Sequence, residues 1–247
     1  MLDLSDPVVT LMINDGDEAT LELDVLLTWS ASDTSGLAAY AISSTKDLGG
    51  ADWISLSGET SVEEEIQEHT INGPDGLKLV YLGVRDTAGR ISTTSDSIWY
   101  VTSRPEGTVL LGDGSGWTNT STIEVRAEHT GGSVATHYKA AFSPSGLEAA
   151  GWVPIVTMVM LEPTEPGGVV TVYCLLLGPH NVTSDLLIDS IRQDLLAPNI
   201  EIVSPSVDRT ENENIKLILS VVDDMDTAPS LDWRINGGDW TPIEGGS

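Results

Sequence analysis

An internal repeat with a period near 95 residues constrains this chain more than any other feature. Three segments open on a proline beside an apolar, strand-like run, and these prolines, Pro7, Pro105 and Pro198, are 98 and then 93 residues apart. The period is too long for one unit of a solenoid and is typical of small domains that each carry their own core. The chain is therefore predicted to be a string of modules rather than one globule.

A recurring tryptophan supports this repeat. Trp53, Trp152 and Trp240 follow the opening proline of their copy by 46, 47 and 42 residues. An apolar run with a Val-Tyr pair recurs at 77–82 and 169–174, in the first two copies only. We predict domains at 1–103, 104–194 and 195–247. The third would hold only the N-terminal half of its domain, so the natural chain is expected to continue beyond this sequence.

The pattern inside each copy predicts β-strands. Residues 21–25 alternate apolar and polar side chains with a period of two, as a half-buried strand does. The first copy contains seven to eight such short runs with turn residues between them, which is the pattern of an antiparallel sandwich. Its one helix-like stretch, 62–68, is short, charged and uncapped, and we expect a loop or a single turn there. The predicted fold class is all-β.

One strand and its following turn carry a resemblance to a known group. Residues 75–90 read Asp-Gly-Leu-Lys-Leu-Val-Tyr-Leu-Gly-Val-Arg-Asp-Thr-Ala-Gly-Arg. This segment resembles a late strand of the tandem Ig-like and fibronectin-III-like modules of bacterial and archaeal surface proteins and viral appendages, which reads Asp-Gly-x-x-x-Val-Tyr-x-x-x-x-Asp-x-x-Gly-Asn, with Arg90 in the place of the final Asn. The resemblance implies Ig-like sandwiches that act as spacers, adhesion tips or decoration. The matching positions are Asp75, Gly76, Val80, Tyr81, Asp86 and Gly89.

The charge balance is strongly acidic. The chain has 38 acidic and 11 basic residues, a formal net charge of −27, and only four lysines. Such a charge opposes compaction in dilute buffer, but the screening length falls from about 8 Å at ~0.15 M salt to about 3 Å at ~1 M. We interpret the surface as adapted to high salt; the alternative is an ordinary acidic extracellular protein. Nucleic acid is excluded as a partner, because binding phosphates requires a basic surface.

The sequence offers no catalytic site and no route into a membrane. No nucleophile motif or phosphate loop is present, and the histidines, His69, His129, His137 and His180, lack the spacing of metal ligands. The single cysteine, Cys174, lies in an apolar strand and is interpreted as a buried packing residue. No run approaches the length of a membrane span, and Met1 is followed by an acidic segment instead of a signal peptide.

Several residues remain as candidates for binding. Two acidic turns suit calcium, which is the one cofactor with candidate ligands here. At Asp223, whose place in the other copies is taken by Asp33 and His129, the alternative is a turn-capping role. Trp117 lies in a glycine-rich loop without a counterpart in the other copies, and is the candidate for stacking on a sugar or a partner protein. Two N-glycosylation sequons lie near predicted turns. The calcium candidates are Asp15, Asp17, Asp223, Asp224 and Asp226, and the sequons begin at Asn119 and Asn181.

Taken together, these features predict a non-enzymatic structural and adhesive array. The first hypothesis is a projecting virion appendage (turret, fibre or spike) of a halophilic virus, since virions assemble in the cytoplasm and need no signal peptide. Its partners would be other proteins of the particle, a host surface protein or glycan, and further copies of this chain. The alternatives are a halophile cell-surface adhesin or S-layer-like protein, and accessory β-domains of a secreted hydrolase.

The salt-adapted surface yields a first prediction. The melting temperature should rise by about 10 °C as sodium chloride is raised from ~0.1 M into the molar range, because screening removes repulsion among the carboxylates. Circular dichroism melts across the salt series measure it. A melting temperature that does not respond to salt would contradict the halophilic interpretation.

Overall fold

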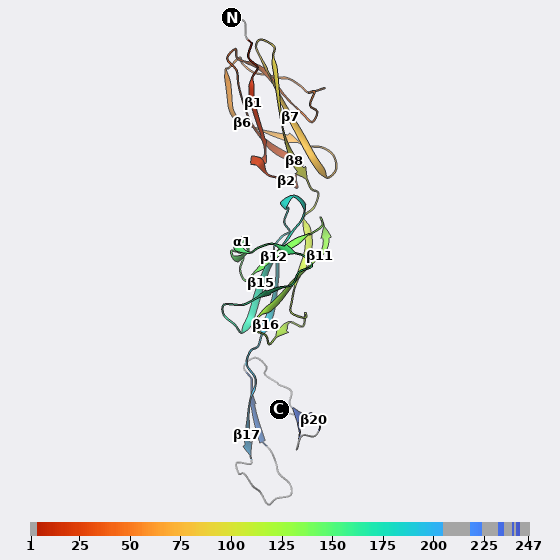
Figure 1. Ribbon diagram of the computed structural model, residues 1–247, viewed down its shortest axis with the longest axis vertical. Coiled ribbons are helices and arrows are strands. Elements are labelled where there is room, and N and C mark those ends of the chain that lie inside the picture. Colours follow the sequence, from red (N-terminus) through yellow and green to blue (C-terminus); the bar gives the residue numbers. More distant parts are fainter. Residues whose placement is uncertain (1–3, 205–217, 224–231, 235–238, 240, 243–247) are drawn as a thin grey trace, which may run out of the picture.

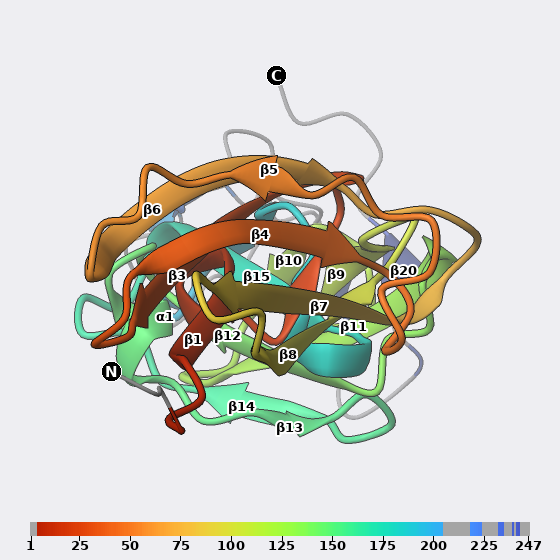
Figure 2. The ribbon, with the colours of Figure 1, turned by 90° about the horizontal axis from the view of Figure 1, so that it is seen from above.

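Two β-sandwiches and shorter strand pairs follow one another along an elongated molecule (Figure 1). The computed structural model describes residues 4–204, 218–223, 232–234, 239 and 241–242. The predicted all-β class is confirmed, because the pairings of the described strands are antiparallel except for two short parallel ones. Viewed along the long axis, the two sandwiches project onto one another, so they are stacked end to end (Figure 2).

The first sandwich packs a three-stranded sheet against a five-stranded sheet. The first sheet has the order β1-β3-β6 and the second the order β2-β8-β7-β4-β5. A short 3-10 turn, η1 (Asn14–Gly16), connects β1 to β2. The strands are β1 (Val8–Ile13), β2 (Ala19–Thr20), β3 (Asp24–Ser32), β4 (Leu37–Ser43), β5 (Ile54–Ser55), β6 (Ser61–Thr70), β7 (Gly76–Asp86) and β8 (Ile91–Tyr100).

The core of this sandwich follows from the period of two along its strands. Val25, Leu27 and Trp29 are buried on one face of β3, while the residues between them are more exposed. Val80 and Leu82 supply the facing side chains from β7. Because alternate residues of both central strands point inward, a dry layer forms between the sheets without any helix.

The second sandwich repeats the first strand for strand. Its sheets have the orders β14-β11-β9 and β10-β16-β15-β12-β13, with each strand in the place of its counterpart in the first copy. It adds a four-residue helix, α1 (Gly146–Ala149), and a 3-10 turn, η2 (Pro179–Asn181). The strands are β9 (Pro105–Leu111), β10 (Trp117–Thr118), β11 (Ile123–Gly132), β12 (His137–Ala141), β13 (Val153–Pro154), β14 (Val159–Leu161), β15 (Gly168–Leu177) and β16 (Leu187–Gln193).

A buried tyrosine organises the second core. Tyr138 is fully buried, and its hydroxyl lies 2.9 Å from the carbonyl of Val125 and 2.7 Å from that of Thr157. These carbonyls belong to β11 and to the turn before β14, so the tyrosine joins the two sheets through the core. A buried hydroxyl needs such a partner, because leaving it unpaired costs about 1–3 kcal/mol.

The expectation of a loop or a helical turn at 62–68 is wrong. These residues lie in the ten-residue edge strand β6, which pairs antiparallel with β3. The pairing with β3 overrides the local charge pattern, and a bulge opposite Trp29 and Ala31 absorbs an extra residue. The glutamates of this segment remain exposed on an edge strand, where charge discourages pairing with other chains.

The turn after β7 explains the presence of arginine at position 90, where the motif that residues 75–90 resemble has asparagine. The backbone amide of Arg90 donates to Asp86 Oδ1 at 2.8 Å, which closes the turn. The Arg90 guanidinium donates to Asp6 Oδ1 at 2.9 Å. The arginine therefore ties the segment before β1 to this turn, a contact that the usual Asn is too short to make.

Strand pairs follow the second sandwich. β17 (Asn199–Ser204) pairs with β18 (Ile218–Val222), and β19 (Asp232–Trp233) pairs with β20 (Thr241–Pro242). The assignment of 195–247 as the N-terminal half of a third Ig-like domain stays a prediction. None of the described helices is long and apolar enough to cross a membrane.

The buried cysteine provides a test of this core. Burial raises the pKa of the Cys174 thiol from 9.0 to about 12, so at a given pH the folded protein holds about a thousandfold less thiolate than an exposed cysteine does. We expect Cys174 to resist a thiol reagent such as Ellman's reagent in the native protein and to react within minutes in guanidinium. Rapid labelling of the native protein would contradict the described packing.

Candidate functional site

The candidate calcium residues of the first copy lie in and after η1. Asp15 and Asp17 are exposed, and Asp15 has a left-handed backbone with φ of 55°. In the described part of the chain, no three His, Cys, Asp or Glu side chains are grouped to hold a metal ion. Of the second candidate set, Asp223 is described, whereas Asp224 and Asp226 lie outside the described residues. Calcium binding at either turn stays a prediction.

Trp117 lies on β10, at the end of the second sandwich that leads to β17. Its side chain is 45% exposed, and the Arg192 guanidinium lies 5.2 Å from the ring centroid. β10 pairs in parallel with the last two residues of β16, directly before the segment that leads to β17. One face of the indole is thus occupied by a cation, and its stacking on a sugar or a partner stays a prediction.

The two sequon asparagines have different surroundings. Asn119 is exposed just after β10. Asn181 lies in η2, and its Nδ2 donates to Glu18 Oε2 of the first sandwich at 2.5 Å. A glycan on Asn181 would need the same nitrogen, so its attachment would compete with this contact.

Hydrogen bonds hold the linker between the two sandwiches, residues 101–104, at both of its ends. The amide of Val101 donates to Thr20 O at 3.0 Å, and the amide of Thr102 donates to Asp75 Oδ1 at 2.9 Å, which hold the linker to the first sandwich. On the other side, the Arg104 guanidinium donates to Thr183 O at 3.0 Å. Little of this short linker is free to rotate.

Side chains from both sandwiches meet beside the linker. The rings of Trp99 on β8 and His180 in η2 stack with centroids 3.9 Å apart and an interplanar angle of 11°. His180 Nδ1 also lies 3.7 Å from Glu18 Oε1. An aromatic stack supplies about 0.5–1.5 kcal/mol beyond the burial of its area, and it depends on orientation. The contact therefore favours one angle between the sandwiches. We call Glu18, Trp99, Arg104, His180 and Asn181 the intermodule junction.

The backbone of η2 directs its side chains to this junction. His180 and Asn181 both have left-handed conformations, with φ of 51° and 61°. Such a conformation is unfavourable for a non-glycine residue and persists only where surrounding contacts hold it. The stack and the hydrogen bond to Glu18 supply those contacts. The sequence did not single out Trp99 or His180, since their pairing brings together the end of strand β8 and the turn η2, which lie about 80 residues apart.

A second repeated feature covers the outer face of each five-stranded sheet. After β4 and after β12 the chain folds back over the sheet, carrying a leucine and, five residues later, the recurring tryptophan. In the first copy, Leu48 and Trp53 cover Gly83, where a Cβ would come within 2.2 Å of Leu48. In both copies a cation lies over the indole: Arg85 at 5.0 Å from Trp53, and Lys139 at 4.8 Å from Trp152. The Leu-x-x-x-x-Trp spacing is the sequence signal that could have revealed this cover.

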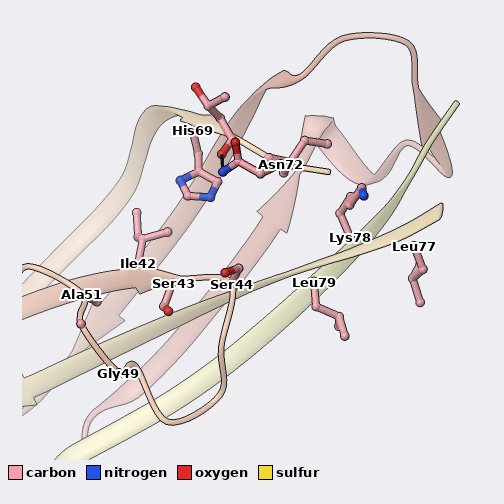
Figure 3. Close-up of a pocket in the computed structure, with 13 residues that line it drawn as sticks. Ile42, Ser43, Ser44, Gly49, Ala51, His69, Asn72, Leu77, Lys78 and Leu79 are labelled. Carbon is pink, nitrogen blue, oxygen red and sulfur yellow. Dashed lines mark hydrogen bonds between the residues drawn. The ribbon is translucent and has the colours of Figure 1, made fainter. Parts of the chain in front are cut away.

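An open hollow of about 560 Å³ lies at the side of the first sandwich (Figure 3). It lies between the end of β4 with the loop that follows, the end of β6 and the start of β7. His69 points into it, and Asn72 and Lys78 lie along the same side. None of the acidic residues in the described part of the chain lines it, although the sequence has 38 acidic residues.

The electrostatics of this hollow differ from those of the rest of the surface. Burial lowers the pKa of His69 below its ordinary value of 6.5, so the ring is neutral near pH 7. No hydrogen bond or ion pair joins this ring to another of the described residues. Lys78 remains the cation of the hollow; its Nζ donates to Pro74 O at 2.5 Å and lies 5.8 Å from the centre of the Tyr100 ring.

No protein-family model matches the sequence. No curated protein is similar to it in sequence. The fibronectin(III)-like modules of Clostridium thermocellum CbhA are similar in structure, with a TM-score of 0.49, 9% identity, and coverage of 74% of this chain and 94% of that one.

Animal proteins with the same kind of module are also similar. The FN1–FN3 domains of chicken CNTN1 have a TM-score of 0.41 and 15% identity, over 74% of this chain and 66% of theirs. A two-domain fibronectin type III segment of chicken tenascin has a TM-score of 0.31 and 14% identity, over 76% of this chain and 100% of that one. The described part of this chain contains two β-sandwiches in tandem. The likeness to these proteins is one of fold alone.

The intermodule junction yields a prediction. Replacing Trp99 with alanine removes the stack on His180, which is worth about 1 kcal/mol, and should broaden the distribution of angles between the sandwiches. Spin labels at exposed Thr93 and Ser190 would measure this by electron–electron double resonance. Trp117→Ala is the matched control, since Trp117 lies at the far end of the second sandwich. An unchanged distance distribution in Trp99→Ala would contradict the role of the stack.

Proposed function

We propose that this chain is a non-catalytic structural and adhesive array that holds a binding surface away from the body that carries it. The observation that supports this most is the intermodule junction. Hydrogen bonds fix the short linker on both sides, and the Trp99–His180 stack adds an oriented contact. A chain of flexibly tethered domains needs no such contacts, whereas a spacer that must project does.

The chemistry of the described surface supports a role without catalysis. The hollows described are open, and no hydrogen bond among their described lining residues joins a serine or threonine hydroxyl to a histidine that could activate it. The single thiol is buried, and its pKa is raised to about 12. Aromatic and cationic side chains instead lie at module ends and on outer sheet faces, where they can stabilise contacts between proteins.

The setting that we propose is the surface of a halophilic virion, where the chain is a turret, fibre or spike involved in host attachment. The net charge of −27 with only four lysines supports a high-salt environment. Its partners would be other proteins of the particle at one end, a host surface protein or glycan along the array, and further copies of the chain around a symmetry axis.

Protein composition of purified particles tests this setting. Mass spectrometry of virions from a producing culture, banded at high salt, should detect the chain at structural-protein abundance. A matched envelope fraction from uninfected cells is the control. Detection of the chain in the envelope fraction and its absence from particles would reject the viral setting and favour the cell-surface adhesin. Catalytic activity of the purified array would reject the non-enzymatic assignment.

A further inference from the structure

The edge of β7 is open where β4 ends. β4 pairs with β7 from Asp86 down to Tyr81, where its partner is Ser43, the last residue of β4. The chain then leaves the sheet for the loop over the outer face. Among the described residues, 76–80 of β7 therefore pair with β8 on one side only. The hollow of Figure 3 lies at this open side, since Leu77, Lys78 and Leu79 line it together with Ser43.

The hydrogen bonds of β8 determine which N–H and C=O groups of β7 point to the open side. The amides of Trp99 and Val101 donate to Glu18 and Thr20, on the side of β2. The residues that alternate with them, Ile98 and Tyr100, therefore bond to β7, opposite Lys78 and Gly76. By the same alternation, Leu77 and Leu79 direct their N–H and C=O groups to the open side. No described backbone or side-chain group pairs with these four groups.

The side chains along this edge alternate in character. Leu77 and Leu79 are 48% and 43% exposed and lie on the outer face of the sheet. Lys78 lies on the opposite face, in line with the core residues Val80 and Leu82, and points toward the hollow that contains His69. An edge with two open amides and two open carbonyls, flanked by exposed leucines, is a template for another strand.

We propose that this edge binds an extended peptide segment of a partner protein as an added antiparallel strand, with apolar side chains opposite Leu77 and Leu79 and an acidic one opposite Lys78. The backbone bonds of such a strand would supply affinity, and its alternating side chains would supply specificity. The acidic position follows from charge complementarity, since the lining contains Lys78 and no carboxylate. The site lies within the first sandwich alone. It extends the proposed adhesive function and does not depend on the proposed viral setting.

The second sandwich supplies an internal comparison. β12 pairs with β15 only from Leu177 to Tyr173, so residues 168–172 of β15 are open toward β12 in the same way. The position of Lys78 is taken there by Val170, which is buried. This second edge lacks the cation and should not select an acidic side chain.

Titration of the full chain with a short peptide tests the proposal. The probe is a capped pentapeptide, Thr-Val-Glu-Val-Thr, followed by amide-resolved NMR at constant salt. In the free protein, the amides of Leu77 and Leu79 should exchange with solvent at least about tenfold faster than those of Lys78 and Val80, because only the latter are bonded in the ladder. Bound peptide should shift and protect Leu77 and Leu79.

Two matched peptides and two matched variants isolate the interactions. A peptide N-methylated at both valines should lose binding, since it cannot donate to the edge. A peptide with lysine in place of glutamate should bind about tenfold more weakly. Lys78→Glu should weaken binding of the glutamate peptide to a similar degree. The control Lys139→Glu, at another half-buried lysine beside an aromatic ring, should leave binding unchanged.

Several results would overturn the proposal. Slow exchange of Leu77 and Leu79 in the free protein would show that the edge is closed. Protection of these amides that grows with protein concentration would show that two copies pair with each other instead. Equal binding of the acidic and basic peptides, or shifts confined to 168–172, would reject the assigned site and its specificity.

Discussion

Burial of alternate side chains between two sheets is the constraint on which the rest of this molecule depends. In the first sandwich, every second residue enters the core along 25–31 of β3 and along 80–84 of β7. In the second sandwich, 123–127 of β11 and 170–176 of β15 repeat this alternation. Because each module satisfies its apolar side chains internally, the loops, strand edges and ends are not needed for the core and are free to take part in contacts. The array can then be lengthened by adding modules, because each junction involves only the two modules that meet there.

The acidic surface makes those contacts selective. Coulomb repulsion discourages contact between the faces of a chain with a net charge of −27 unless a specific interaction offsets it. The intermodule junction relies on an aromatic stack, an amide on Glu18 and the guanidinium of Arg104. The side hollow, which lacks carboxylates, is a second place where the general repulsion is weaker. The few cations and aromatic rings therefore determine where this acidic surface can form contacts with another protein surface.

Much of the architecture could be predicted because it depends on short-range patterns in the sequence. The opening prolines, the period of two along 21–25 and the recurring tryptophan are short-range patterns, and they lead to sandwiches in tandem. The prediction failed at 62–68, where a glutamate-rich segment without strand character pairs with β3. A strand on the edge of a sheet needs only one bonded side, so its sequence can be dominated by solubility instead of β-propensity.

The sequence by itself determined the modular all-β plan, the acidic surface and the burial of Cys174, since each depends on composition or on neighbours in the chain. Only the tertiary structure decided the stacking of Trp99 on His180 and the open edge at Leu77 and Leu79. The first requires the end of β8 in one module to meet the turn η2 of the other, and the second depends on where β4 ends its pairing with β7. Neither leaves a local signal, because contacts between distant segments are fixed by the packing of whole sheets.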